Sequence, residues 1–193
     1  MPLVKVIIGS TRPGRFGVQP ATWIMNLAKE HPEINFELVD LKEINLPFLD
    51  EEKPALLGEY KNAHTKAWSQ IVGEADGFIV VTGEYNHTVT PALINAIDFL
   101  AAEWRYKPVA FVSYGASAGG ARAVEHLRSV VGRLGMYDLT DGVHIVNYWT
   151  QLDESGTFQP TEEQTTTAHG LIKNVGFWAE NLKTARQKLA EKA

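Results

Sequence analysis

Short apolar runs alternate along the chain with longer segments in which apolar residues recur every three or four positions. The apolar runs have the length of strands and lie at residues 4–8, 34–39, 76–82, 108–114 and 143–146. The segments with helical spacing lie at residues 18–29, 59–73, 91–100, 124–134 and 162–189. A continuous apolar run is typical of a buried strand, and the wider spacing is typical of a helix with one apolar face. The alternation predicts an α/β fold, a doubly wound, five-stranded parallel sheet with helices on both faces.

Two of the predicted strands differ in their apolar pattern. Residues 76–82 are almost entirely apolar, as expected for a central strand covered on both faces. Ile34, Phe36 and Leu38 alternate with other residues, so we expect these three side chains to share one face.

Residues that favour a helix start, and prolines that disfavour regular structure, lie between some of the predicted strands. Thr90 and Pro91 offer a hydroxyl cap followed by proline at the first helical position. The prolines in residues 41–54 argue against regular structure there. No repeat or low-complexity linker interrupts the pattern, so we expect a single domain over residues 1–193.

Three polar, glycine-containing loops follow three of the predicted strands, at residues 10–17, 83–90 and 113–120. In doubly wound sheets, ligands bind beyond the carboxyl ends of the strands, where the strand order reverses. We therefore expect these loops to converge on one ligand site.

The first loop combines hydroxyls, glycines and two arginines between a strand and a helix. Ser10 can donate a hydrogen bond, and Arg12 and Arg15 carry guanidinium groups suited to phosphate oxygens. The backbone N–H groups at the start of the following helix add a positive end. The loop is neither a P-loop nor a dinucleotide-binding G-x-G-x-x-G motif. It predicts a local phosphate site, the alternative being a polar loop with solvated arginines.

The second loop, Glu84-Tyr85-Asn86-His87, offers backbone groups, an aromatic face and an amide. Such a loop suits the edge of a flat heteroaromatic ring. The alternative is a turn in which Asn86 stabilises its own backbone and Tyr85 covers the core.

The third loop contains Gly115-Ala116-Ser117-Ala118-Gly119, which matches the G-x-S-x-G pattern of serine hydrolases. A hydrolase using Ser117 would need a histidine and an acid later in the chain. The candidates are His144 and His169, with Asp138, Asp141 or Asp153. No His-Gly-Gly oxyanion segment precedes the pattern, which weighs against this alternative.

The amino-acid composition limits the classes of molecule that the protein is expected to bind. The formal charge of −5 and the pI near 5.7 argue against a nucleic-acid or membrane-surface binder. There is no cysteine, and the five histidines other than His87 have no ligand-like spacing, so we expect no metal site. His87 belongs to the second loop and could touch a substrate. We find no signal peptide or membrane span and expect a cytoplasmic protein. Tyr148 and Trp149 could line a pocket or a subunit contact, but packing in the core or at its rim is the simpler interpretation.

Several motifs, in order and spacing, resemble the NADPH-dependent FMN reductase family. They are Gly-Ser-Thr-Arg-Pro-Gly-Arg at 9–15, residues 75–82 running into Glu84-Tyr85-Asn86, residues 91–98, and residues 107–109 through Gly119-Gly120. The resemblance implies a flavodoxin-like fold with strand order 2-1-3-4-5, bound FMN, and NAD(P)H as electron donor. It also implies a homodimer or homotetramer.

The resemblance implies roles for particular residues. Ser10, Arg12, Arg15 and the backbone of Phe16, Gly17 and Val18 would hold the FMN phosphate, Glu84, Tyr85, Asn86 and His87 would border the isoalloxazine ring, and Ser113 and Gly115 would close the third loop. The flavin itself would carry the hydride, so no catalytic acid or base is assigned. Electrons would pass by a ping-pong mechanism to a quinone, azo compound, free flavin or metal ion.

The chain departs from the family pattern at two places. Phe16-Gly17-Val18 stands where family loops often carry Ser-x-Asn, and Gly83 stands where Pro usually precedes Glu84. The first change removes side-chain donors for the phosphate. The main functional alternative is a non-enzymatic flavin electron carrier, although such carriers tend to be more acidic than this chain.

Overall fold

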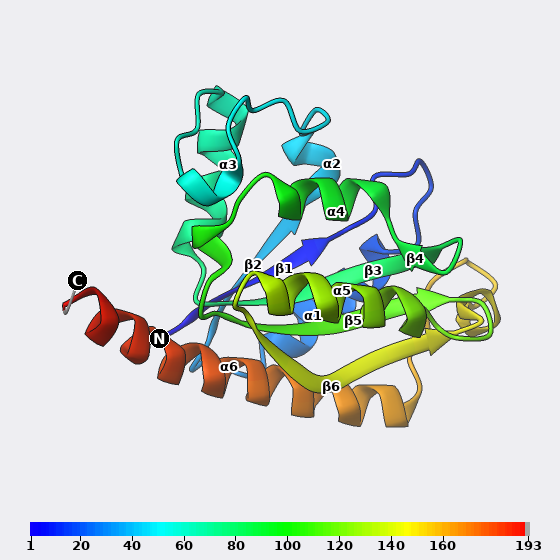
Figure 1. Ribbon diagram of the computed structural model, residues 1–193. Coiled ribbons are helices and arrows are strands. Elements are labelled where there is room, and N and C mark those ends of the chain that lie inside the picture. Colours follow the sequence, from blue (N-terminus) through cyan, green and yellow to red (C-terminus); the bar gives the residue numbers. More distant parts are fainter. Residues whose placement is uncertain (192–193) are drawn as a thin grey trace.

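The computed structural model describes residues 1–191, which form a parallel sheet with helices on both faces (Figure 1). Its long strands are β1 (Leu3–Ile8), β2 (Asn35–Asp40), β3 (Gly77–Tyr85), β5 (Pro108–Gly115) and β6 (Tyr137–Val146). They pair in the order β2-β1-β3-β5-β6, and all of these pairs are parallel. The flavodoxin-like strand order is confirmed. The short strand β4 (Thr88–Val89) makes six strands rather than five, and it pairs antiparallel with the end of β3.

Helices cover the two faces of the sheet unequally. α1 (Val18–Ala28) and α6 (Glu162–Ala190) lie on one face, and α3 (Ala63–Glu74), α4 (Pro91–Asp98) and α5 (Ala121–Arg133) lie on the other (Figure 1). The remaining helices are short: α2 (Leu41–Ile44) and the 3₁₀ turns Ala55–Leu57, Ala102–Trp104 and Tyr148–Gln151.

Alternation along the strands supplies a core to each face. In β3, Ile79 and Val81 pack toward α1 and α6, whereas Phe78 and Val80 pack toward α3, α4 and α5. Both sets are buried, as the almost entirely apolar sequence of this strand predicts.

Three expectations about helices and strands need correction, and strand β2 is less covered than its apolar pattern suggests. Ile34 and Phe36 pack against the core beneath α1 and α6, whereas Leu38 of β2 is exposed. β2 is an edge strand and pairs only with β1 among the described residues, so less of it is covered. α3 begins at Ala63 rather than near residue 59, and residues 41–54 do contain a helical turn, α2. β6 begins at Tyr137, six residues earlier than predicted.

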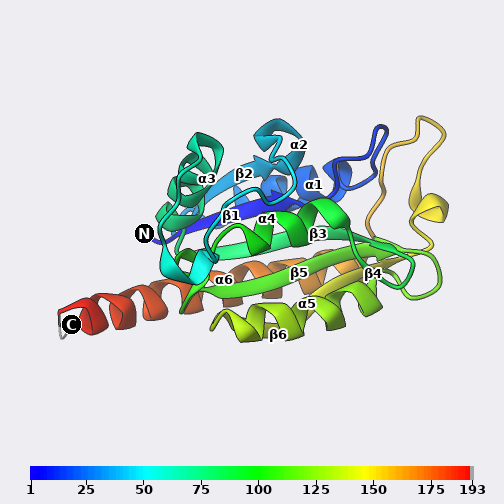
Figure 2. The same cartoon turned by 45° about the horizontal axis from the view of Figure 1, so that its top comes forward.

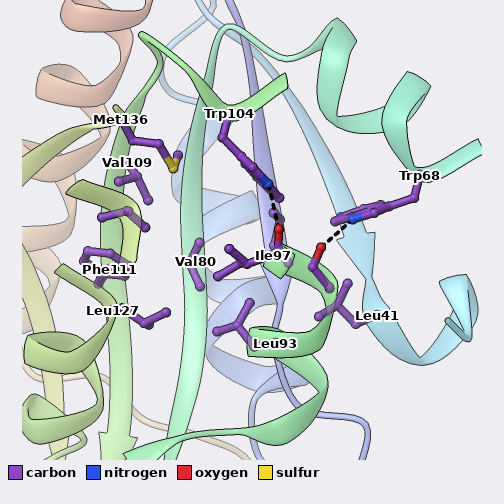
Figure 3. Close-up of a pocket in the computed structure, with 13 residues that line it drawn as sticks. Leu41, Trp68, Val80, Leu93, Ile97, Trp104, Val109, Phe111, Leu127 and Met136 are labelled. Atoms are coloured by element: carbon purple, nitrogen blue, oxygen red, sulfur yellow. Dashed lines mark hydrogen bonds between the residues drawn. The ribbon is translucent and has the colours of Figure 1, made fainter. Parts of the chain in front are cut away.

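The core beneath α3, α4 and α5 holds a small apolar cavity of about 10 Å³ (Figure 3). Two tryptophans on its border satisfy their indole N–H groups: Trp68 donates to the Ala96 carbonyl at 2.8 Å, and Trp104 donates to the Ile97 carbonyl at 3.1 Å. The cavity wall is apolar, so a water molecule would lack the polar partners it needs there. This void is a packing defect of the core rather than a ligand site.

The loops that follow the strands gather at one edge of the molecule. The loop after β1, the β3–β4 hairpin and the segment after β6 lie at that edge in both views, opposite the N-terminus and the end of α6 (Figure 2). Within residues 1–191, no helix is long and apolar enough to cross a membrane.

Candidate functional site

A cleft of about 220 Å³ lies where these loops meet. Its lining residues come from four segments of the chain: Ser10, Arg12, Arg15, Phe16, Gly83, Glu84, Tyr85, Tyr114, Gly115, Ala116, Tyr148 and Trp149. Of the residues expected to bind the cofactor, the cleft brings together Ser10, Arg12, Arg15, Phe16, Glu84, Tyr85 and Gly115. It does not include Gly17, Val18, Asn86, His87 or Ser113.

Arg15 is the most unusual residue of the first loop. Its side chain is only 8% exposed, and Nη2 pairs with the Asp40 carboxylate at the end of β2. Its Nε and Nη1 are buried without a hydrogen-bond partner anywhere in residues 1–191. A buried, unpaired donor on a charged group is costly unless an acceptor completes it. An anionic oxygen in the cleft would supply that acceptor.

Two hydroxyls tie the first loop to the second. Ser10 Oγ lies 3.1 Å from the phenol oxygen of Tyr85. Thr90 occupies the cap position of α4, but its hydroxyl does not cap the helix; it donates to the Gly9 carbonyl at 2.7 Å. Because Thr90 is buried, this bond fixes the end of β1 against the start of α4.

The second loop is a hairpin. β3 continues through Glu84 and Tyr85, and Asn86 and His87 form the two-residue turn that leads into β4. Their φ values are 51° and 65°, the left-handed region that such tight hairpin turns require. The turn interpretation therefore describes the backbone at both positions, and both side chains are exposed outside the cleft lining.

The carboxylate of Glu84 already has hydrogen-bond partners within the protein. It accepts hydrogen bonds from Arg122 Nε at 2.7 Å, from Arg122 Nη2, and from the Arg122 backbone N–H at 3.2 Å. The pairing holds the hairpin against the first turn of α5. A ligand in the cleft can therefore use the backbone of Glu84 more readily than its carboxylate.

Tyr114 explains the glycine at position 83. Its ring lies so close to Gly83 that a Cβ there would meet ring atom Cε2 at 2.9 Å, and a Cβ on Gly17 would meet its phenol oxygen at 2.8 Å. Burial raises the pKa of the Tyr114 phenol to about 12, against hydrogen bonds from Ser10 and the Gly17 backbone. Gly17 therefore packs against the Tyr114 side chain and is not part of the cleft surface.

Ser113 is buried and braces the third loop. Its hydroxyl donates to the Gly119 carbonyl at 2.7 Å and accepts from His144 Nδ1 at 2.7 Å. Since a hydroxyl has one proton, these bonds place the neutral ring's proton on Nδ1. Partial burial of the ring, followed by the nearby Arg128 charge, lowers the pKa of His144.

The serine-hydrolase arrangement is not assembled. Of the two candidate histidines, His144 bonds to Ser113 rather than Ser117, and His169 Nδ1 lies 3.2 Å from His31 Nε2. Asp138, one of the candidate acids, pairs with Arg128 at 2.5 Å. Neither candidate histidine therefore serves as the base that would activate Ser117.

Tyr148 and Trp149 line the cleft, a placement that the sequence interpretation did not favour. Tyr148 stacks on Phe16 with the ring centroids 4.3 Å apart and the planes inclined by 23°. The two residues directly follow a strand at the ligand-binding edge of the sheet, which was the available signal.

The amino-acid sequence of the chain matches a known protein family. The family model for NADPH-dependent FMN reductase matches residues 2–151. An NAD(P)H-dependent FMN reductase of Schizosaccharomyces pombe is 39% identical over 137 residues, which cover 70% of this chain and 68% of that protein. An NAD(P)H:quinone oxidoreductase of Solanum tuberosum is 30% identical over 173 residues, 85% of this chain and 86% of the relative.

Solved structures agree in fold. The flavoenzyme NAD(P)H:(acceptor) oxidoreductase FerB from Paracoccus denitrificans superposes with a TM-score of 0.72 at 21% identity, covering 94% of this chain and 98% of FerB. The chain belongs to the NADPH-dependent FMN reductase family. It is an oxidoreductase that uses FMN, with NAD(P)H as the electron donor.

The residues of the cleft fit FMN. The unpaired Nε and Nη1 of Arg15 can donate hydrogen bonds to phosphate oxygens, and Arg12 adds a second guanidinium on the exposed side. The edge formed by Gly83, Glu84 and Tyr85 offers backbone groups to a flat ring.

Proposed function

We propose that the cleft binds FMN and passes electrons from NAD(P)H to a small acceptor such as a quinone, azo compound, free flavin or metal ion. The observation that carries this proposal is the buried guanidinium of Arg15, a residue of the cleft lining, with two nitrogens that have no hydrogen-bond partner within residues 1–191. Curated relatives named as reductases of FMN and of quinones support the choice of acceptor class.

Each part of the cleft has its own task in this proposal. Ser10, Arg12 and Arg15 hold the phosphate, together with the backbone of Phe16. Gly17 and Val18 lie outside the cleft lining and contribute by forming the start of α1 behind it. Bound FMN supplies the hydride-accepting ring. Glu84, Tyr85, Asn86 and His87 contribute the hairpin that borders this ring, mainly through the backbone, while Ser113 and Gly115 shape the third loop.

No acid or base needs to be supplied by the protein. The donor and the acceptor occupy the open side of the cleft in turn, which predicts ping-pong kinetics. A sequential pattern with a quinone would argue against this shared site.

We also propose that the chain assembles as a homodimer or homotetramer. Phe48 is 85% exposed, and Leu56 and Leu57 are exposed in the same segment between β2 and α3. Phe48 borders a groove of about 620 Å³ that reaches Thr11 of the first loop, so a second copy covering it would lie beside the cleft. Light scattering of the purified protein measures the assembly directly.

The visible absorption spectrum of the purified protein tests the central proposal. We expect flavin bands, FMN in the heat-released fraction, and bleaching of the bands when NAD(P)H is added without air. Bleaching separates a reductase from a passive electron carrier, because a carrier does not oxidise NAD(P)H directly. A colourless protein that fails to take up added FMN would contradict the proposal.

A further inference from the structure

Trp149 stands out among the lining residues because it is 52% exposed yet belongs to the cleft. A single exposed aromatic residue elsewhere on a protein surface needs no explanation. An exposed aromatic face inside a ligand cleft is different, since a bound ring can cover it.

The backbone around Trp149 is held firmly. The Asn147 N–H donates to the Ala116 carbonyl at 3.1 Å, which ties the segment to the third loop. Gln19 of α1 holds the same segment from the other side: it accepts from the Phe158 N–H at 2.6 Å and donates to the Gly156 carbonyl at 3.0 Å. Trp149 therefore belongs to a segment, residues 147–158, that hydrogen bonds hold to the third loop and to α1. The chain after β6 lies at the ligand-binding edge of the sheet (Figure 2).

A line of aromatic contacts leads from the cleft floor to Trp149. The ring of Tyr114 packs edge to face against Phe16, with the ring centroids 5.1 Å apart. Phe16 stacks on Tyr148 at a centroid distance of 4.3 Å. Tyr148 in turn packs edge to face against Trp149, with the centroids 5.4 Å apart. Phe16 and Tyr114 are buried, and only Trp149 ends this line with a largely open face. Phe16, which replaces a polar residue of the family loop, thereby acts as a positioning residue for Tyr148 and Trp149.

We propose that Trp149 is a binding residue whose indole stacks against a planar conjugated ring in the cleft. This inference rests on the proposed function, which supplies two such rings: the isoalloxazine of FMN and a flat acceptor bound beside it. Aromatic stacking of this kind contributes beyond the area it buries, and it corresponds to an affinity change of about threefold to tenfold.

The test compares three variants with the wild type. Trp149→Ala removes the aromatic face, and Trp149→Phe keeps a smaller one. Phe177→Ala is the matched control, because Phe177 is also an exposed aromatic residue, at 60%, but lies on α6 outside the cleft lining. Thermal unfolding of each variant shows that the fold is retained.

The first measurement is the dissociation constant of FMN for the apoprotein, obtained from flavin fluorescence. An increase of about threefold to tenfold in Trp149→Ala, with Trp149→Phe and Phe177→Ala near the wild type, assigns the stacked ring to FMN. The difference in tryptophan emission between the wild type and Trp149→Phe should then fall when FMN binds.

The second measurement is KM for a naphthoquinone and for ferricyanide, which has no flat ring. Unchanged FMN affinity with a KM raised about threefold to tenfold for the naphthoquinone only, in Trp149→Ala, assigns the ring to the acceptor. If neither the FMN affinity nor this KM changes while the wild type binds FMN, the inference about Trp149 is wrong and the proposed function stands. If the wild type does not bind FMN, it is the proposed function that fails.

Discussion

Buried charged side chains at the two ends of the sheet differ in how completely their hydrogen-bonding groups are paired. At the amino ends of the strands, Asp76 accepts from the Leu3 N–H at 3.0 Å, from Lys183 at 2.8 Å and from Arg186 at 2.7 Å. Nearby, Lys107 donates to the Val72 and Gly73 carbonyls at 2.8 and 3.0 Å, at the end of α3. Both charges are buried and well partnered.

At the carboxyl ends, the pairing is incomplete. Arg15 is as buried as Asp76, with 8% of each side chain exposed, but Arg15 leaves two nitrogens without a partner in the described chain. A buried charge with complete pairing stabilises one arrangement of the fold, whereas one with open positions favours a ligand that completes it. We therefore expect the charged residues at the amino ends of the strands to stabilise the fold, and Arg15 at the carboxyl ends to bind a ligand.

Breaking the amino-end network should have the largest effect, and it should be on stability. Asp76→Ala leaves Lys183, Arg186 and the Leu3 N–H without their acceptor, at a cost of about 3 kcal/mol in the free energy of unfolding. Urea denaturation measures the loss, with Glu154→Ala, an exposed acidic site, as the control. FMN affinity of the folded variant should stay within about twofold of the wild type; a larger loss would show that the two ends are coupled.

Removing the carboxyl-end charge should act on binding instead. Arg15→Ala takes away charge-assisted bonds to the phosphate, and we expect about 30-fold weaker FMN binding, or about 2 kcal/mol. Arg12→Ala should weaken FMN less, since Arg12 is exposed. Riboflavin has no phosphate, so its affinity should not change; equal weakening of riboflavin and FMN would contradict the phosphate role.

Alkaline pH should change the contribution of Lys107. Burial, followed by the Arg186 charge, lowers the pKa of Lys107 from 10.5 to about 8. Between these values the unfolded chain still holds a proton that the folded chain has released, so Lys107 makes the free energy of unfolding rise with pH. The rise amounts to about 1 kcal/mol between about pH 8 and 9.

Lys107→Met isolates this effect from the other titrating groups. We expect the difference in unfolding free energy between the wild type and Lys107→Met to grow across that window in favour of the wild type. A difference that is constant with pH would mean that Lys107 keeps its ordinary pKa.

The smallest expected change concerns a neutral donor in the same cleft as Arg15. Ser10→Ala removes one hydroxyl and its contact with Tyr85, and FMN binding should weaken about threefold. Comparing Ser10→Ala with Arg15→Ala in one titration separates neutral from charged hydrogen bonding. An effect of Ser10→Ala as large as that of Arg15→Ala would contradict this ranking.

Much of the fold was predictable because it depends on local pattern. The apolar runs predict β1, β3 and β5 within a few residues, and the position of the polar loops after them predicts the edge at which the cleft forms. Arg12 and Arg15 were recognisable because a strand, a polar loop and a helix follow one another directly in the sequence.

Contacts distant in the sequence were not predictable. Glu84 looks like a free carboxylate until α5 brings Arg122, 38 positions later, against it. Tyr148 enters the cleft because Phe16 stacks on it, and neither residue alone carries a signal for the other. The hairpin turn at Asn86 and His87 was open to local interpretation, but the pairing of β4 with β3 decides it.

The contact between Gly83 and Tyr114 also constrains how this family can vary. A proline at position 83 would bring a Cβ to within 2.9 Å of a ring that Phe16 and Tyr148 hold in place. The two positions should therefore covary: relatives with proline there should carry a smaller residue in place of Tyr114. An evolutionary path between the two forms would have to shrink the tyrosine before the proline can be accepted.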